Sequence, residues 1–297
     1  MKNGDIDAMV KSSITRILSL AVAGTFASST AFADDHSFFT NWLDNVSQTQ
    51  EIQPHWMTPL VTVTPRLEQE FRFDASHADK PKGVKLDNYG GGKGLELIPS
   101  ENTEIIIGMP AYQDQSTPKA STTGTGWGDE NLLLKYRIVS ANEEHGNYIV
   151  SAFIGVSLPT GSNLFTSHHT IITPTLAAGK GWGDRDTGVD VQSTLGISLP
   201  TAGADGPLGL GRPLTWNTAL QGHMGKFWPE IETGYTHWYD GALAGKNQLI
   251  VTYGTTLGRF EIEKRVKAIV GVGYQTVQGT REVNLNHGIL ATLRITF

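Results

Sequence analysis

The sequence contains no cysteine and no long apolar run, and both absences narrow the classes of protein that it can form. Without cysteine there is neither a disulfide scaffold nor a thiolate metal site. No segment after residue 33 approaches the run of about 18 apolar residues that marks a transmembrane helix. The net charge of −6 and the absence of a basic run argue against a nucleic-acid partner.

Residues 1–33 have the pattern of an export signal. Lys11 and Arg16 supply positive charge, residues 17–26 are apolar, and Ala31-Phe32-Ala33 is a small-x-small cleavage site. An apolar stretch of this length is too short to anchor the chain as a membrane-spanning helix. We therefore predict a signal peptide that is cleaved after Ala33.

The rest of the chain is rich in alternating patterns. Residues 60–73, 266–275 and 289–297 each alternate apolar with polar or charged positions. Because successive side chains on a strand point to opposite faces, each segment has one apolar and one polar face. Further candidate strands lie near residues 93–99, 103–111, 129–139, 147–158, 170–178, 188–199, 213–222, 227–239 and 248–257. The pattern predicts an all-β fold, an antiparallel transmembrane β-barrel of about 12 strands within a range of 10–14.

The connections and the start of the mature chain complete the predicted organisation. Long outer loops are expected at residues 74–92, 112–128, 159–169 and 200–212, and shorter turns between them, as in outer-membrane barrels. Residues 34–57 do not alternate, and Phe38, Phe39, Trp42, Leu43 and Val46 fall at helical spacing. This range is predicted to be a periplasmic segment or plug, with a disordered leader as the alternative, and 58–297 the barrel.

The polar faces of the predicted strands carry charges of both signs. The set is Arg66, Glu68, Glu70, Arg72, Lys135, Arg137, Glu230, Glu232 and Arg294. A charge that faces lipid near the membrane midplane costs about 2–4 kcal/mol, so these side chains are expected to face the lumen. There they either pair across the barrel or line a narrow aqueous path. The mixed signs favour pairing and predict weak ion selectivity.

Aromatic residues share the apolar register of the predicted strands. They are Tyr148, Trp216, Phe227, Tyr235, Tyr239, Tyr253, Tyr274 and Phe297, many near strand ends, where membrane barrels have aromatic girdles. Phe297, preceded by the alternating apolar residues Ile295 and Leu293, resembles the C-terminal signal that the outer-membrane assembly machinery recognises. We accordingly expect that machinery and outer-membrane lipid as partners.

Two repeated blocks carry a second resemblance. Gly126-Trp127-Gly128-Asp129 and Gly181-Trp182-Gly183-Asp184 each precede a predicted strand, and residues 155–161 and 196–201 share a Gly-x-Ser-Leu-Pro-Thr pattern. With His55-Trp56, residues 58–65 and the run 132–137 after the first block, they resemble a family of outer-membrane barrels named for the meta-pathway of phenol degradation. The resemblance implies passage of hydrophobic or aromatic compounds across the outer membrane, and it implies no catalytic residue.

Motifs for catalysis or cofactor binding are weak. Residues 90–94 are glycine-rich, but they lack the spacing of a phosphate loop and are predicted to form a turn. His168 and His169 are adjacent, so on a strand they could not bind one metal together. Ser167 and His169 have the spacing of a nucleophile and its base, but they lie in a predicted loop. We predict no metal, no cofactor and no enzymatic activity.

The sequence as a whole predicts a protein of the cell outer membrane. Its expected function is a channel or transporter for passive uptake of small molecules, including hydrophobic or aromatic ones. A structural or adhesive barrel, whose outer loops carry the function, stays open as the alternative. An outer-membrane lipid hydrolase that uses Ser167 and His169 is a third class.

Overall fold

The computed structural model describes residues 36–91, 93–206, 209–279 and 285–297. The chain divides into two units, one up to Asp44 and one from Asn45 to Phe297. Helix α2 (His36–Glu51) begins in the first unit and ends in the second. No helix among the described residues is long and apolar enough to cross a membrane. The predicted export signal and its cleavage site at Ala33 lie outside the described residues.

The second unit is built mainly of strands, and four of the described connections between them contain a short 3-10 turn. The strands are β1 (Glu70–Lys80), β2 (Val84–Tyr89), β3 (Gly94–Ser100), β4 (Thr103–Ile107), β5 (Tyr112–Ser116), β6 (Gly124–Trp127), β7 (Glu130–Ala141), β8 (Tyr148–Leu158), β9 (Ile171–Gly183), β10 (Thr187–Ile197), β11 (Leu199–Pro200), β12 (Pro213–Met224), β13 (Phe227–Trp238), β14 (Asn247–Glu261), β15 (Lys267–Gln278) and β16 (His287–Thr296). The turns are η1 (Pro81–Gly83), η2 (Ala120–Thr122), η3 (Glu143–His145) and η4 (Gly241–Leu243).

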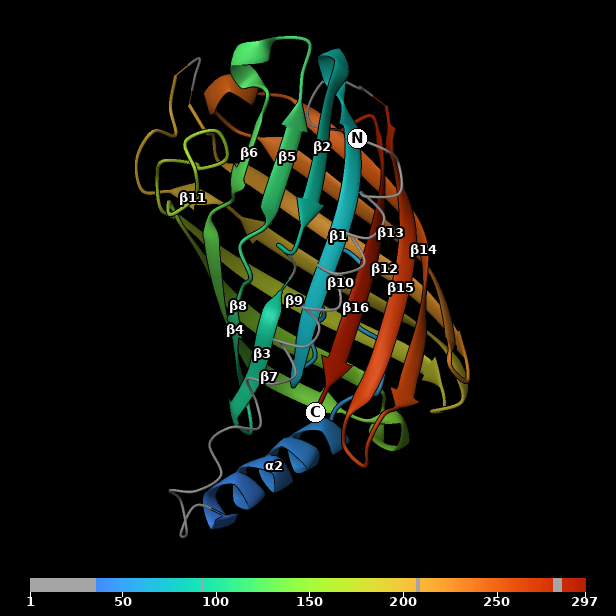
Figure 1. Ribbon diagram of the computed structural model, residues 1–297. Helices are drawn as coiled ribbons and strands as arrows, with labels where there is room; N and C mark the ends of the chain where they lie inside the picture. The colour runs from blue at the N-terminus through green and yellow to red at the C-terminus, as the bar shows by residue number, and fades with distance from the viewer. Residues whose placement is uncertain (1–35, 92, 207–208, 280–284) are drawn as a thin grey trace, which may run out of the picture. The chain divides into compact units, whose positions relative to one another are not determined.

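These strands close into one barrel. Neighbours in the sheet are antiparallel, and β16 pairs with both β15 and β1, which seals the wall. Four pairs of segments, β2 with β3, β4 with β5, β6 with β7 and β10 with β11, follow one another within single interrupted strands (Figure 1). The 16 segments therefore form twelve wall strands, and the predicted twelve-stranded antiparallel barrel is confirmed.

The start of the wall differs from the prediction. Residues 60–69 are not a strand, and β1 begins only at Glu70. The predicted loops at 74–92 and 112–128 are also wrong, because they contain most of β1 together with β2, β5 and β6. These segments were missed because they carry polar residues on both faces, so the alternation that marks a half-apolar strand is absent. The predicted loops at 159–169 and 200–212 do separate wall strands.

The glycine-rich stretch was predicted to be a turn, but its described residues lie at the interruption between β2 and β3 of one wall strand. It joins β2 to β3, and both run in the same direction along the wall. Gly90, Gly91 and Gly94 have positive φ angles of 86°, 75° and 74°, a conformation that favours glycine. The amide of Gly90 donates to Asp74 O at 2.8 Å, so the interruption remains hydrogen-bonded to β1.

The wall has an apolar outer face and a polar inner face. Exposed outward side chains include Phe71, Leu134, Tyr136, Trp216, Tyr235, Tyr253, Val272, Tyr274, Ile289 and Leu293. Buried inward side chains include Glu96, Glu104, Lys135, Gln192, Gln221, Glu232, Thr256 and Arg294. A water-soluble domain has the opposite arrangement, whereas a barrel that spans a lipid bilayer requires this one. The fold is therefore a transmembrane β-barrel.

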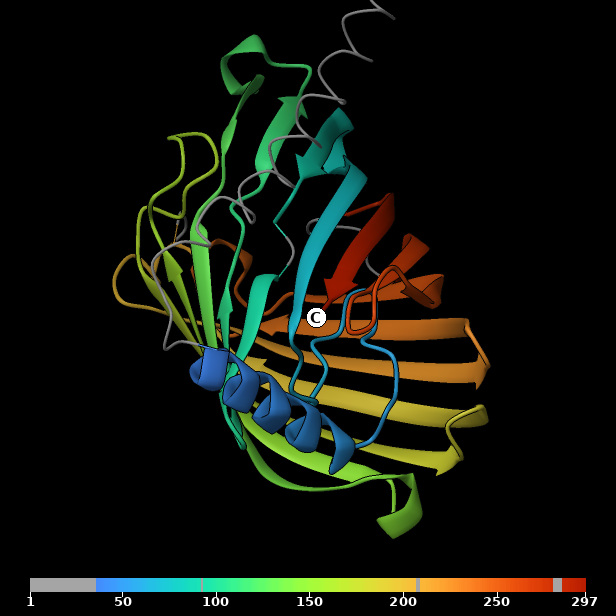
Figure 2. The same ribbon diagram turned by 60° about the horizontal axis from the view of Figure 1, so that its bottom comes forward.

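A stretch without helix or strand lies inside the barrel. Residues 53–69, which we call the inner segment, connect α2 to β1 (Figure 2). Most of their side chains are buried. We call the barrel end where β1 begins and β16 ends the C-terminal rim, and the opposite end the loop rim. The inner segment crosses the boundary that the sequence analysis placed between residues 57 and 58.

Candidate functional site

The lumen holds the nine charged residues that the sequence analysis selected, and all of them are buried. Glu70 and Arg72 lie on β1, Lys135 and Arg137 on β7, Glu230 and Glu232 on β13, and Arg294 on β16. Arg66 and Glu68 also lie in the lumen, but they belong to the inner segment and not to a wall strand. The structure therefore sets seven wall charges opposite a segment that carries two charges of its own.

Cationic side chains of the wall bind the backbone carbonyls of the inner segment. Arg294 donates to Thr58 O at 2.5 Å and to Pro59 O at 2.9 Å. Arg72 donates to Leu60 O at 2.5 Å, and its Nε contacts Asp74 at 2.9 Å. Buried carbonyl groups without a strand partner would otherwise lose their hydrogen bonds at a cost of about 1–3 kcal/mol each.

Acidic side chains of the wall bind the backbone amides of the same segment. Glu232 accepts hydrogen bonds from Val61 N at 2.8 Å and Thr62 N at 2.5 Å. Glu104 accepts one from Glu68 N at 2.6 Å and pairs with Lys135 Nζ at 2.9 Å. Wall charges of both signs thus provide the hydrogen bonds that a sheet would provide elsewhere.

Glutamine side chains bind the inner segment as well, and the sequence analysis did not identify them. Gln53 bonds to both the N and the O of Leu67, at 2.9 and 2.8 Å, which folds the segment back on itself. Gln192 on β10 donates to Met57 O at 3.0 Å and accepts from Thr64 Oγ1 at 2.7 Å. For Gln192 the available signal is an uncharged polar residue at an inward position of a strand, whereas Gln53 lies on no strand and carries no such signal.

Two apolar side chains of the inner segment fit against glycines of the wall. A Cβ at Gly179 would lie 2.5 Å from Trp56 Cζ3, and one at Gly181 would also meet the Trp56 ring. A Cβ at Gly271 would lie 2.8 Å from Leu60, and one at Gly273 3.0 Å from it. Any larger residue at these four inward positions would push Trp56 or Leu60 away. The glycines therefore form two sockets for the segment.

Cavities lie on both sides of the inner segment. Towards the loop rim, cavities of 550 and 230 Å³ share Lys93 and Asn131 in their linings, and Val61 is 44% exposed in the first. Towards the C-terminal rim, a cavity of 430 Å³ is lined by Arg66, Glu68, Arg259 and other mostly polar residues. The inner segment separates these spaces.

The inner segment is also tied to a turn at the C-terminal rim. His55 N and His55 Nδ1 lie 2.6 and 2.8 Å from the two carboxylate oxygens of Glu143 in η3. Burial alone would raise the pKa of Glu143, but the hydrogen bonds from the His55 side chain and backbone lower it to about 2. Glu143 is therefore ionised at neutral pH and holds the start of the segment.

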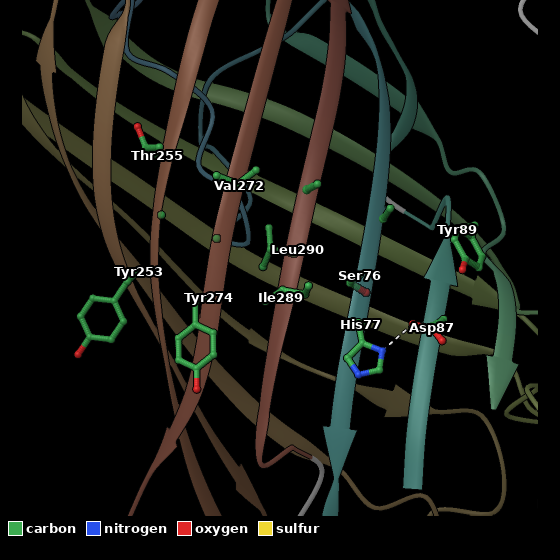
Figure 3. A pocket seen from close by; sticks show the side chains of 14 residues that line it. Ser76, His77, Asp87, Tyr89, Tyr253, Thr255, Val272, Tyr274, Ile289 and Leu290 are labelled. Carbon is green, nitrogen blue, oxygen red and sulfur yellow. Dashed lines mark hydrogen bonds and ion pairs between the residues drawn. The ribbon is translucent and has the colours of Figure 1, made fainter. Parts of the chain in front are cut away.

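The outer face of the wall has a hollow of its own. It measures 660 Å³ and is lined mostly by apolar side chains of β14, β15, β16, β1 and β2. Tyr253, Tyr274 and Ile289 lie along it, and His77 pairs with Asp87 at 2.7 Å at one side (Figure 3). These side chains belong to the outward register, so the hollow faces lipid and is separate from the lumen.

The candidate catalytic pair is not formed. Ser167 Oγ donates to Asp129 Oδ2 at 2.7 Å and contacts the backbone carbonyl of His169 at 2.8 Å. Asp129 also accepts hydrogen bonds from the amides of Gly161 and Ser167, at 2.9 and 2.8 Å. Asp129 thus fastens the loop between β8 and β9. Among the described residues, no group of three or more His, Asp or Glu side chains is arranged to hold a metal ion.

The two Gly-Trp-Gly-Asp blocks lie at opposite rims. The first ends β6 and leads into β7 on the side of the loop rim, where Asp129 has the contacts just described. The second ends β9 at the C-terminal rim, where Asp184 accepts hydrogen bonds from Asp186 N and Thr187 N, both at 2.8 Å. Each block precedes a strand, as the sequence analysis expected, but the first lies within the interrupted wall strand that β6 and β7 form.

Comparison with known proteins gives similarity in structure alone. No family model matches the sequence, and no curated protein matches it. An outer membrane channel from Pseudomonas putida F1 is 13% identical, with 76% of this chain and 92% of that chain covered and a TM-score of 0.48. The NanC porin is 9% identical (76% and 98% covered, TM-score 0.44) and the KdgM porin 11% identical (76% and 99%, TM-score 0.41). At these levels the functions of those proteins do not transfer to this chain.

Proposed function

We propose that the protein is an outer-membrane channel for passive passage of small molecules, closed in this structure by its inner segment. The observation that carries the proposal is the separation of cavities on the two sides of residues 53–69. The barrel interior is occupied by a stretch of chain that belongs to no strand, and not by the side chains of the wall alone. Displacement of this stretch would join the cavities into one path.

The composition of the cavity on the loop side supports small amphiphilic solutes. Leu60, Val61 and Val63 contribute apolar surface, and Arg72 and Gln113 contribute hydrogen-bonding groups. A solute with an apolar body and a few polar atoms fits such a lining. Hydrophobic or aromatic molecules therefore remain the proposed class. Export through residues 1–33 and assembly through Leu293, Ile295 and Phe297 are part of the same proposal, with the C-terminal rim on the periplasmic side.

A disulfide between the inner segment and the wall tests the proposal. Because the natural sequence has no cysteine, the two introduced cysteines are the only ones within the chain that can form it. A Cβ at Gly254 would contact a δ-carbon of Leu60, so Leu60→Cys with Gly254→Cys places two sulfurs within bonding reach. We expect the oxidised pair to show no channel openings in planar bilayers and no solute flux in liposome swelling. Reduction should restore the openings of the wild-type barrel.

Leu60→Cys alone and the reduced double variant are the matched controls, because neither has the bond and neither sets a new side chain against Leu60. If the oxidised pair conducts as well as the reduced pair, the inner segment is not the closure. If the wild-type barrel gives neither conductance nor solute flux across a range of voltages, the channel itself is refuted.

A further inference from the structure

The cavity at the C-terminal rim is lined by an excess of cationic side chains. They are Arg66, Arg185, Arg259, Lys264, Arg265 and Lys267, which come from the inner segment, two rim turns and two neighbouring strands. The negative charges at the lining are Glu68, which pairs with Arg66 at 2.8 Å, and the terminal carboxylate of Phe297, and Arg185 pairs with Glu51 outside it. A cleft lined by one sign of charge raises the local concentration of ions of the opposite sign.

The backbone of β14 is distorted in a way that turns one of these cations inward. The pairing of β14 with β15 shifts register between Gly258 and Phe260, and Arg259 between them has a φ of 57°. A bulge of this kind redirects a side chain, and a positive φ is unfavourable for any residue except glycine. The Arg259 guanidinium donates to His55 O at 2.8 Å and to Trp56 O at 3.0 Å.

Arg66 approaches the same carbonyl from the other side. It also donates to Trp56 O, so two guanidinium groups meet at one neutral acceptor. Arg66 is 3% exposed, and its Nε has no hydrogen-bond partner among the described residues. Glu68 is the carboxylate that forms an ion pair with Arg66, and among the described residues Arg259 forms no ion pair within 4.0 Å, although Glu68, Glu70 and Glu143 act on it from further away.

The two lysines at the mouth of the cavity complete the arrangement. Among the described residues, neither Lys264 nor Lys267 has an acidic side chain within 4.0 Å. Lys267 pairs with Thr296 of β16 and shares the inward register with Ile269 and Gly271. It therefore faces the lumen and the cavity, where a soluble ligand can reach it.

We propose that this cavity is a binding site for a small soluble oxyanion, with the charge and oxygen geometry of a phosphate group. Guanidinium and ammonium groups at the wall and mouth would donate charge-assisted hydrogen bonds to its oxygens. The cavity volume of 430 Å³ accommodates free phosphate or a small solute that carries one. The site goes beyond the proposed channel, since anion binding requires no conductance.

Titration of the detergent-solubilised full-length barrel with inorganic phosphate, followed by ³¹P NMR at constant ionic strength, tests the site. We expect saturable binding that weakens as sodium chloride is raised, because salt screens charges at a mouth open to solvent. Lys264→Ala with Lys267→Ala should weaken the affinity by about tenfold or more, since two charged donors are lost. Lys264→Arg with Lys267→Arg should retain it.

Lys226→Ala is the matched control, because Lys226 lies in the neighbouring turn between β12 and β13 and does not line the cavity. It should bind phosphate as the wild type does. No saturable binding by the wild type would overturn the proposal. Equal binding by the wild type and the Lys264→Ala, Lys267→Ala variant would also overturn it. The assay measures binding and not transport. The channel proposal can therefore be refuted while the binding site is confirmed, and the binding site can be refuted while the channel is confirmed.

Discussion

The two halves of the lumen are organised differently although the same strands enclose both. In the half towards the C-terminal rim, the inner segment and buried wall charges occupy the interior above the 430 Å³ cavity at the rim, and Lys135, Glu104 and Arg294 are fully buried. Towards the loop rim the wall faces cavities of 550 and 230 Å³. Barrel size therefore does not decide whether the lumen is filled. The difference comes from one segment of chain and from the wall residues that bind its backbone.

The largest predicted effect follows from removal of Lys135 from the filled half. Lys135→Met leaves Glu104 buried without its cation, and loss of one partner of a buried pair costs about 3–5 kcal/mol. Lys135 Nζ also donates to Arg66 O at 3.1 Å, so the inner segment should loosen. We expect a lower free energy of unfolding in urea and more frequent openings in planar bilayers.

Lys85→Met is the control for this prediction, because Lys85 is exposed near the loop rim. It should leave both measurements unchanged. The double variant Lys135→Met, Glu104→Gln should recover part of the lost stability, since no unpaired charge is left at that position. A Lys135→Met barrel as stable as the wild type would show that the charges of the filled half do not hold the segment.

A pair of glycines, one in each half, gives a second and smaller contrast. A Cβ at Gly271 would lie 2.8 Å from Leu60, whereas one at Gly155 would have its nearest neighbour at 3.4 Å, an ordinary contact. Gly271→Ala should therefore cost about 1–3 kcal/mol through overpacking and should increase conductance as Leu60 is displaced. Gly155→Ala should change neither. Equal conductance of the two variants would exclude the glycine sockets as a determinant of closure.

The same contrast explains what the sequence could predict. The wall strands from β8 to β16 have one apolar and one polar face, so the alternating pattern predicted their positions. It also predicted that Glu230, Glu232 and Arg294 on these strands point inward. The inner segment also alternates, at residues 60–69, but its two faces meet wall charges and glycine sockets and not lipid and lumen. An alternating sequence shows that neighbouring side chains differ in polarity, but it does not show what each of them contacts in the fold. Residues 60–69 were therefore predicted as a strand.

Some determinants of the filled half leave no local signal in the sequence. Gly179 and Gly271 resemble any glycine in a strand, and their role depends on Trp56 and Leu60, which are more than a hundred residues away. The bulge that turns Arg259 inward depends on the register of β14 against β15. Such long-range contacts are set by the closed barrel and not by the local pattern.

The smallest predicted effect concerns the tie between His55 and Glu143 at the C-terminal rim. The ordinary pKa of a glutamate is 4.5, and that of Glu143 is lowered to about 2 in the folded protein. A depressed carboxyl pKa contributes stability that is present above pH 4.5 and is lost as the pH falls from 4.5 towards 2. Glu51 lies 3.5 Å from His55 Nε2 and also pairs with Arg185, so both charged groups belong to the surroundings of this contact. Acidification over this range should increase channel openings.

Glu143→Gln removes the titrating group while it keeps a hydrogen-bonding side chain in η3. This variant should open more often than the wild type at pH 7, and its openings should change less between pH 5 and pH 3. Glu144→Gln is the matched control, because Glu144 is exposed in the same turn and should leave the wild-type pH profile in place. Single-channel recordings at each pH provide the measurement. If Glu143→Gln and the wild type have the same profile, the rim contact does not restrain the inner segment, and the wall contacts deeper in the lumen are sufficient to hold it.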